Sequence, residues 1–390
     1  MAAASGYTIL DQRLDHYKEI VSKKKEEKDM TKGFLLDFFK ILDPKGQAHL
    51  AQDVSGCATD ELLRLLVKSL TDCLLGPMKG AGGKTSSNPT PMVPRLGIED
   101  SIDNMVAQDH DPVTRGAQKA LRRNCMQRDG SRCVASRAWQ NGLENIPDDD
   151  DTANLEAAHI LPFNLGSFNR NDSQEVLKHA NTWVNINRYF PTLKTMSFTS
   201  EHLNAEKNAM MLDRTLHFEF SAFRMCFVAT GIRNQYHIKT FKDIPSQALK
   251  CLPTNRLATF QSHSGSWELP DPELLRIHAQ LAEFFHMSGH GERIDKILRD
   301  YEELGVLASD GSTNVEDLLA IRLSSLPLNV RERSDSESKP SGKHPLSKEQ
   351  GGPSENVRPR SDSESKASGK HVAPKRGGQQ PSPSGPENKP

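Results

Sequence analysis

The sequence predicts an α+β protein, in which one mixed domain over about residues 115–240 lies between helical segments and a polar C-terminal tail. Three observations support this prediction. Apolar residues recur at helical spacing before residue 75, strand-like and helix-like runs alternate from 115 to 240, and apolar periodicity ends near residue 330. The 390 residues have room for about two or three folded units.

The composition limits the class of protein. Hydrophobic residues make up 35% of the chain and charged residues 26%, with a mean hydropathy of −0.62, so a sizeable part is predicted to be disordered. The net charge of −1 excludes a global attraction to nucleic acid, so any such contact needs a local basic surface. The six cysteines form no CxxC pair, which favours reduced thiols. We expect a nuclear or cytoplasmic protein that is neither secreted nor inserted in a membrane.

The first 75 residues predict a helical module. Amphipathic runs cover 8–30 and 31–42, and a third helix is expected to start near Thr59, where TDEL is close to a capping box. Gly, Pro and Ser are dense over 76–100, which predicts a linker. The module is a candidate surface for protein partners.

The mixed domain over 115–240 begins with a basic helix, and helices over 241–325 are expected to pack on it. Asp271-Pro272 is a strong helix start, because Asp caps a helix and Pro suits its first position. The predicted strands cover 132–135 and the segment from Leu155, with an antiparallel pair at 224–230 and 235–241. The predicted helices cover 115–129, 173–190, 271–287 and 293–304, and a turn into a helix is expected at 208–220.

The C-terminal segment 330–390 is rich in Ser, Pro, Gly and Lys, so it cannot bury enough apolar surface to offset the entropy of ordering. We expect it to be disordered. RSDSESK occurs twice in it, at 333–339 and 360–366. This duplicated tract is a second candidate for protein partners or regulation.

Three residues of the mixed domain could carry chemistry. His159 ends the predicted strand LEAAH, Asn208 opens a turn, and His217 follows nine residues later. Hydrolysis of a phosphodiester needs a base that activates water, a divalent ion, and ligands for that ion. Taken singly, each residue has a plain structural alternative: His159 as a satisfied core histidine, Asn208 as a turn former or helix cap, and His217 as a ring packed beside aromatic neighbours.

The local motifs resemble those of the HNH endonuclease family, in particular the version common in fungal proteins. The matching segments are RDGSRC at 128–133 and AAHILPF at 157–163, followed by Asn208 and His217. The resemblance implies a ββα-metal finger embedded in the mixed domain. It also implies a phosphodiester hydrolase that uses one Mg²⁺ or Mn²⁺ ion, with His159 as general base, His217 as metal ligand and Asn208 orienting the loop or the base.

One position departs from the family pattern. Many members carry an Asp or His ligand immediately before the base, where this chain has Ala158. Glu156, on the same face of the predicted strand, and Asp213, four residues before His217, are the candidate replacements. The alternative is a catalytically inactive HNH-like module that acts as a binding or scaffold protein.

The basic segment at the start of the domain supplies candidate nucleic-acid contacts. The expected partner is nucleic acid, DNA more than RNA, bound through its phosphates without reading sequence. The candidate phosphate-binding residues are Arg122, Arg123, Arg128 and Arg132.

Overall fold

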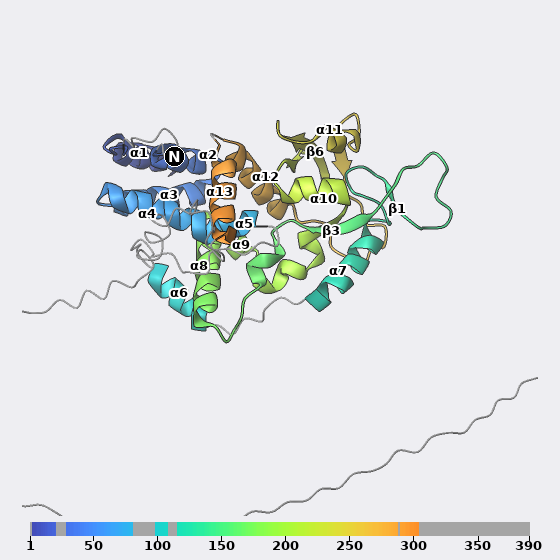
Figure 1. Ribbon diagram of the computed structural model, residues 1–390, viewed down its shortest axis with the longest axis horizontal. Helices are drawn as coiled ribbons and strands as arrows, with labels where there is room; N and C mark the ends of the chain where they lie inside the picture. Colours follow the sequence, from blue (N-terminus) through green and yellow to red (C-terminus); the bar gives the residue numbers. More distant parts are fainter. Residues whose placement is uncertain (1, 21–28, 81–97, 108–114, 288, 304–390) are drawn as a thin grey trace, which may run out of the picture. The chain divides into compact units, whose positions relative to one another are not determined.

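The computed structural model describes residues 2–20, 29–80, 98–107, 115–287 and 289–303 (Figure 1). All of them belong to one compact unit, Met1–Asn329, and the predicted disordered tail lies outside the described residues. The α-helices are α1 (Ala2–Asp15), α2 (Thr31–Ile41), α3 (Pro44–Gly56), α4 (Asp60–Leu70), α5 (Gly76–Lys79), α6 (Ile98–Ala107), α7 (Arg115–Arg128), α8 (Ser173–Tyr189), α9 (Pro191–Thr195), α10 (Arg214–Ser221), α11 (Ser246–Lys250), α12 (Pro272–His286) and α13 (His290–Glu303).

Short helical turns and seven strands complete the described elements. The turns are the π-helix η1 (Thr71–Leu75) and the 3-10 helices η2 (Phe163–Gly166), η3 (Ser200–Asn204) and η4 (Glu206–Asn208). The strands are β1 (Trp139–Gln140), β2 (Thr152–Ala153), β3 (Leu155–His159), β4 (Ala209–Asp213), β5 (Met225–Ala229), β6 (Gln235–Thr240) and β7 (Leu257–Thr259). This mixture of helices and small sheets confirms the α+β class.

The N-terminal region is helical as predicted, but its boundaries differ. The prediction of a helix over 8–30 is wrong, because α1 ends at Asp15, and residues 21–28 lie outside the described residues. α4 starts where expected, and the Thr59 hydroxyl accepts a hydrogen bond from the Leu62 amide. α3 was not predicted, although Asp43 caps it and Pro44 occupies its first turn. Most of the predicted linker lies outside the described residues.

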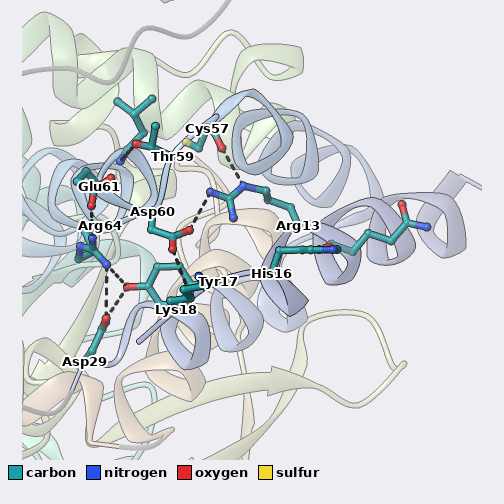
Figure 2. Close-up of polar contacts among 12 residues, drawn as sticks. Arg13, His16, Tyr17, Lys18, Asp29, Cys57, Thr59, Asp60, Glu61 and Arg64 are labelled. Atoms are coloured by element: carbon teal, nitrogen blue, oxygen red, sulfur yellow. Dashed lines mark hydrogen bonds and ion pairs between the residues drawn. The ribbon is translucent and has the colours of Figure 1, made fainter. Parts of the chain in front are cut away.

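A polar network joins the end of α1 to the start of α4 (Figure 2). The Tyr17 hydroxyl donates to Asp29 at 2.5 Å and accepts from Arg64 at 3.0 Å. Arg13 pairs with Asp60 at 3.1 Å. These contacts connect residues on both sides of the segment 21–28, and they give the N-terminal helices polar cross-links in addition to their apolar core.

The apolar core continues from the N-terminal helices to the C-terminal ones. Phe34 and Phe38 of α2 lie 5.1 and 5.6 Å from the ring of Phe284 in α12, both edge-on. Edge-to-face aromatic pairs of this kind add to the stabilisation from burial. The segment at 271–287 is a helix as predicted, and the Asp271 side chain accepts a hydrogen bond from the Glu273 amide at its first turn.

The strands β3 and β4 form an antiparallel pair, with Leu155 opposite Asp213 and His159 opposite Ala209. Helix α10 begins directly after β4, and Figure 1 shows α10 and α7 on opposite sides of β3. The prediction of a turn into a helix over 208–220 is therefore wrong for 209–213. All five side chains of β4 are buried, so this strand lacks the polar–apolar alternation that identifies a strand with one exposed face.

The strand predicted at 132–135 is absent from the structure. Arg132 forms only an isolated bridge with Trp139, and the segment around it turns tightly. Ser131 and Arg137 have positive φ angles, and so does Gly130 at +64°. A Cβ atom at Gly130 would lie 2.8 Å from the His263 ring, so this turn requires glycine.

The predicted antiparallel pair near 224–241 is confirmed as β5 and β6, and β7 adds a third strand to the sheet. Helix α12 packs on β5. Among the described residues, no helix combines the length and the apolar character needed to cross a membrane.

Candidate active site

His159 occupies the last position of β3, where the strand gives way to a loop. Its Nε2 atom lies 3.0 Å from Oδ1 of Asn204, the last residue of η3. Burial lowers the pKa of His159, the Asn204 hydrogen bond raises it, and the charge of His217 lowers it; the net pKa lies below 6.5. The imidazole is therefore neutral near pH 7, as a general base must be.

Glu156 and His217 form a second contact on the same pair of strands. Glu156 lies on β3, and its Oε2 atom is 2.7 Å from Nδ1 of His217 on α10. Arg214, at the start of the same helix, places its Nε atom 3.9 Å from the other oxygen of Glu156. The side chains of Glu156 and His217 are 44% and 28% exposed, so both can reach a solvent-borne ligand.

The candidate base and the Glu156–His217 pair share strand β3, because His159 follows Glu156 by three residues on it. Among the described residues, no group of three or more His, Cys, Asp or Glu side chains is arranged to hold a metal ion. The protein itself thus offers two candidate ligands, His217 and Glu156.

Asn208 is fully buried and connects three backbone groups. Its Oδ1 atom accepts from the Leu161 amide at 2.9 Å, and its Nδ2 atom donates to the carbonyls of Leu161 and Leu203 at 3.0 and 2.9 Å. Asn208 therefore fastens the loop that follows His159 to the segment that precedes β4. Its hydrogen bonds are with the backbone, so any influence on the base acts through the loop.

Asp213 serves α10 as its N-cap. Its Oδ1 atom accepts from the Leu216 amide at 3.0 Å, and the Cys133 thiol lies 3.7 Å from its Oδ2 atom. The spacing of four residues between Asp213 and His217 predicts that they share one face of a helix, but Asp213 precedes the helix. The buried carboxylate of Asp213 caps the start of α10. Burial and the nearby charge of Asp213 raise the pKa of Cys133, so this thiol stays protonated.

The prediction that Arg128 contacts nucleic acid is wrong. Its side chain is fully buried and all five of its N–H groups are used inside the protein. Two of them bind the carboxylate of Asp129 at 2.7 and 2.9 Å. The other three donate to the carbonyls of Glu206, Glu268 and Ala209 at 2.7, 2.9 and 2.8 Å.

The other three arginines differ in how available their side chains are for contact with phosphate. Arg122 and Arg123 are exposed on α7, and Arg122 also donates to the Leu155 carbonyl at 3.1 Å. Arg132 stacks on Trp139 at 3.7 Å and pairs with Asp150 at 3.2 Å. A phosphate would have to displace Asp150 to bind Arg132, whereas Arg123 has no ion pair within the part of the chain that the structure describes.

Asn204 is the site residue that sequence reasoning missed. It lies in a stretch with no motif, and it reaches His159 only because η3 is placed against the end of β3. Its Nδ2 atom is buried and has no hydrogen-bond partner among the described atoms. The sequence gives no periodicity or spacing that singles out this residue.

The comparisons with known proteins bear on the segment that contains these residues. Neither the curated proteins nor the solved structures gave a match. A family model described as HNH endonuclease matches residues 133–228, which include His159, Asn204, Asn208 and His217. This part of the chain is therefore assigned to the HNH endonuclease family.

Proposed function

We propose that this protein is a metal-dependent endonuclease that hydrolyses phosphodiester bonds of DNA, or of RNA, with water activated by His159. The observation that carries the proposal is a neutral histidine at the end of β3, inside a segment that matches the HNH endonuclease family. A neutral imidazole within reach of solvent can accept the proton of an attacking water.

Asn204 determines which nitrogen of His159 would act. An amide oxygen only accepts hydrogen bonds, so the Nε2 atom of His159 donates to Oδ1 of Asn204. The lone pair then resides on Nδ1, and this atom would take the proton from water. Asn208 contributes indirectly, because it fixes the loop that leaves His159.

The donor set fits a divalent cation that keeps several waters. His217 donates from Nδ1 to Glu156, which leaves Nε2 as a ligand atom, and Glu156 can bind directly or through water. Bound Mg²⁺ or Mn²⁺ would supply the positive charge that stabilises the developing negative charge on phosphate. Together, β3, β4 and α10 would make up the ββα-metal finger of the family. Arg122 and Arg123 would contact the flanking phosphates.

A catalytically inactive, HNH-like binding module is the second candidate. Ala158, which occupies the position of a usual metal ligand, is fully buried against the core. Among the described residues, the two ligand candidates have no third partner. A module of this kind would bind nucleic acid or protein with the same fold and would leave phosphodiesters intact.

Plasmid cleavage distinguishes the two candidates. The full chain is incubated with supercoiled DNA in Mg²⁺, in Mn²⁺ and in EDTA, and wild type is compared with His159→Ala. His237→Ala, an exposed histidine on β6, is the matched control. We expect metal-dependent nicking that falls on the order of 10²- to 10⁴-fold in His159→Ala alone. Absence of nicking by folded wild-type protein supplied with metal would favour the binding module.

A further inference from the structure

The exposed face of α10 carries more than the candidate metal ligand. Arg214, His217 and Phe218 are spaced at i, i+3 and i+4, so they share one side of the helix. The Arg214 side chain is 80% exposed, and Phe218 is 65% exposed. The opposite side carries Leu216 and Phe220, both fully buried.

Phe218 therefore lies in solvent on a helix that buries its other large apolar side chains. Burying such a ring stabilises a folded protein, and Phe218 forgoes most of this contribution. Single exposed apolar residues are common and carry no function by themselves. The surroundings of Phe218 distinguish it from such residues.

A guanidinium group is fixed over the Phe218 ring. The Cζ atom of Arg224 lies 5.1 Å from the ring centroid. Arg224 is held in place by Glu219, whose buried carboxylate accepts from Nε at 2.5 Å. The ring thus has one side near a positioned cation while much of its surface stays open, so a planar ligand would find a preorganised platform.

We propose that Phe218 stacks an unpaired nucleobase, with the exposed guanidinium of Arg214 attracting the phosphates beside it. Aromatic rings flanked by cations bind single strands in this way, because every base has a flat face that can stack. Bases inside a duplex already stack on each other and cannot reach such a ring. This inference rests on the proposed nuclease function and specifies its substrate: nucleic acid with an unpaired base near the cleaved bond.

Binding of labelled oligonucleotides in EDTA tests the proposal without cleavage. Fluorescence anisotropy of the full chain is measured with single-stranded DNA, single-stranded RNA and duplex DNA of one sequence. The variants are Phe218→Ala and Phe218→Tyr. Ile232→Ala is the matched control, because Ile232 is equally exposed at 65% but lies in the turn between β5 and β6.

We expect Phe218→Ala to weaken single-strand binding about tenfold, from the loss of one stacked base, and to change duplex binding little. Phe218→Tyr and Ile232→Ala should bind single strands like wild type. The DNA and RNA arms show which single strand is preferred. Equal losses for single strand and duplex, no loss in Phe218→Ala, or no binding by wild type would overturn the proposal.

Plasmid nicking separates this proposal from the nuclease proposal. If Phe218-dependent single-strand binding occurs without nicking by wild type, the stacking site stands and the catalytic function fails. If wild type nicks DNA while Phe218→Ala binds single strands as tightly as wild type does, catalysis stands and the stacking site fails.

Discussion

Two polar groups lie against the strands β3 and β4, and they differ in how completely their hydrogen bonds are satisfied. Arg128 donates to the Ala209 carbonyl, and Ala209 is the strand partner of His159. All donors of Arg128 are paired out of contact with water. Glu156 and His217, in contrast, contact each other and Arg214 at a partly exposed surface. The comparison teaches that a saturated buried group supports the fold, while a group with open coordination sites can act on a ligand.

The saturated group should show the largest effect on stability. Arg128→Met leaves the Asp129 carboxylate buried without its cation and removes one donor from each of three backbone carbonyls. We expect the free energy of unfolding to fall by about 3–5 kcal/mol, measured by urea denaturation. Arg123→Met on the exposed side of α7 is the control and should stay within about 0.5 kcal/mol of wild type. Equal stabilities for the two variants would remove the distinction between buried support and exposed surface.

Asn208 belongs with the saturated group, although the sequence presents it as a site residue. Asn208→Ala removes three hydrogen bonds and leaves backbone groups of Leu161 and Leu203 without these partners. We expect a loss of about 2–4 kcal/mol in the free energy of unfolding. Asn141→Ala, which removes one exposed side-chain contact, should lose less than about 0.5 kcal/mol. An Asn208→Ala protein as stable as wild type would contradict this structural role and would favour a direct part for Asn208 in the chemistry.

The difference between the two groups also explains what the sequence could predict. The His159 and His217 positions follow from short motifs in the chain. The helix starts at Thr59 and Asp271 follow from local capping signals. The role of Arg128 does not, because its partners Glu206, Ala209 and Glu268 are 78 to 140 residues away.

Two further errors concern the backbone conformation of short segments. β4 is a short, wholly apolar run, and such runs do not separate strand from helix by periodicity. The sequence predicts a strand at 132–135, where Cys133 and Val134 suit a strand, but the positive φ angles of Ser131 and Arg137 turn the chain there. In both cases tertiary contacts, which lie outside any local window, decide the backbone conformation.

Changes to Glu156 and His217, the partly exposed pair, should alter the affinity for a metal ion more than the stability of the fold. Glu156→Gln keeps the shape of the side chain but removes the charge that orients His217. We expect divalent-ion affinity to fall about 10- to 100-fold, measured by calorimetric titration with Mn²⁺, with little change in urea stability. Glu144→Gln, an exposed acid in the loop between β1 and β2, is the control. Unchanged Mn²⁺ affinity in Glu156→Gln would exclude Glu156 from the metal centre.

The smallest effect concerns the pH dependence of the base. The pKa of His159 lies below 6.5 chiefly because of burial, so nicking by wild type should persist near pH 7 and fall as the pH drops through that lower pKa. Asn204→Asp places a carboxylate beside Nε2, which favours the charged imidazolium and raises the pKa. The acidic limb of the nicking rate should therefore move to higher pH, while the rate well above neutrality changes less. Asn141→Asp, away from His159, should leave the limb in place, and a limb unmoved in both variants would show that Asn204 does not contact the base during catalysis.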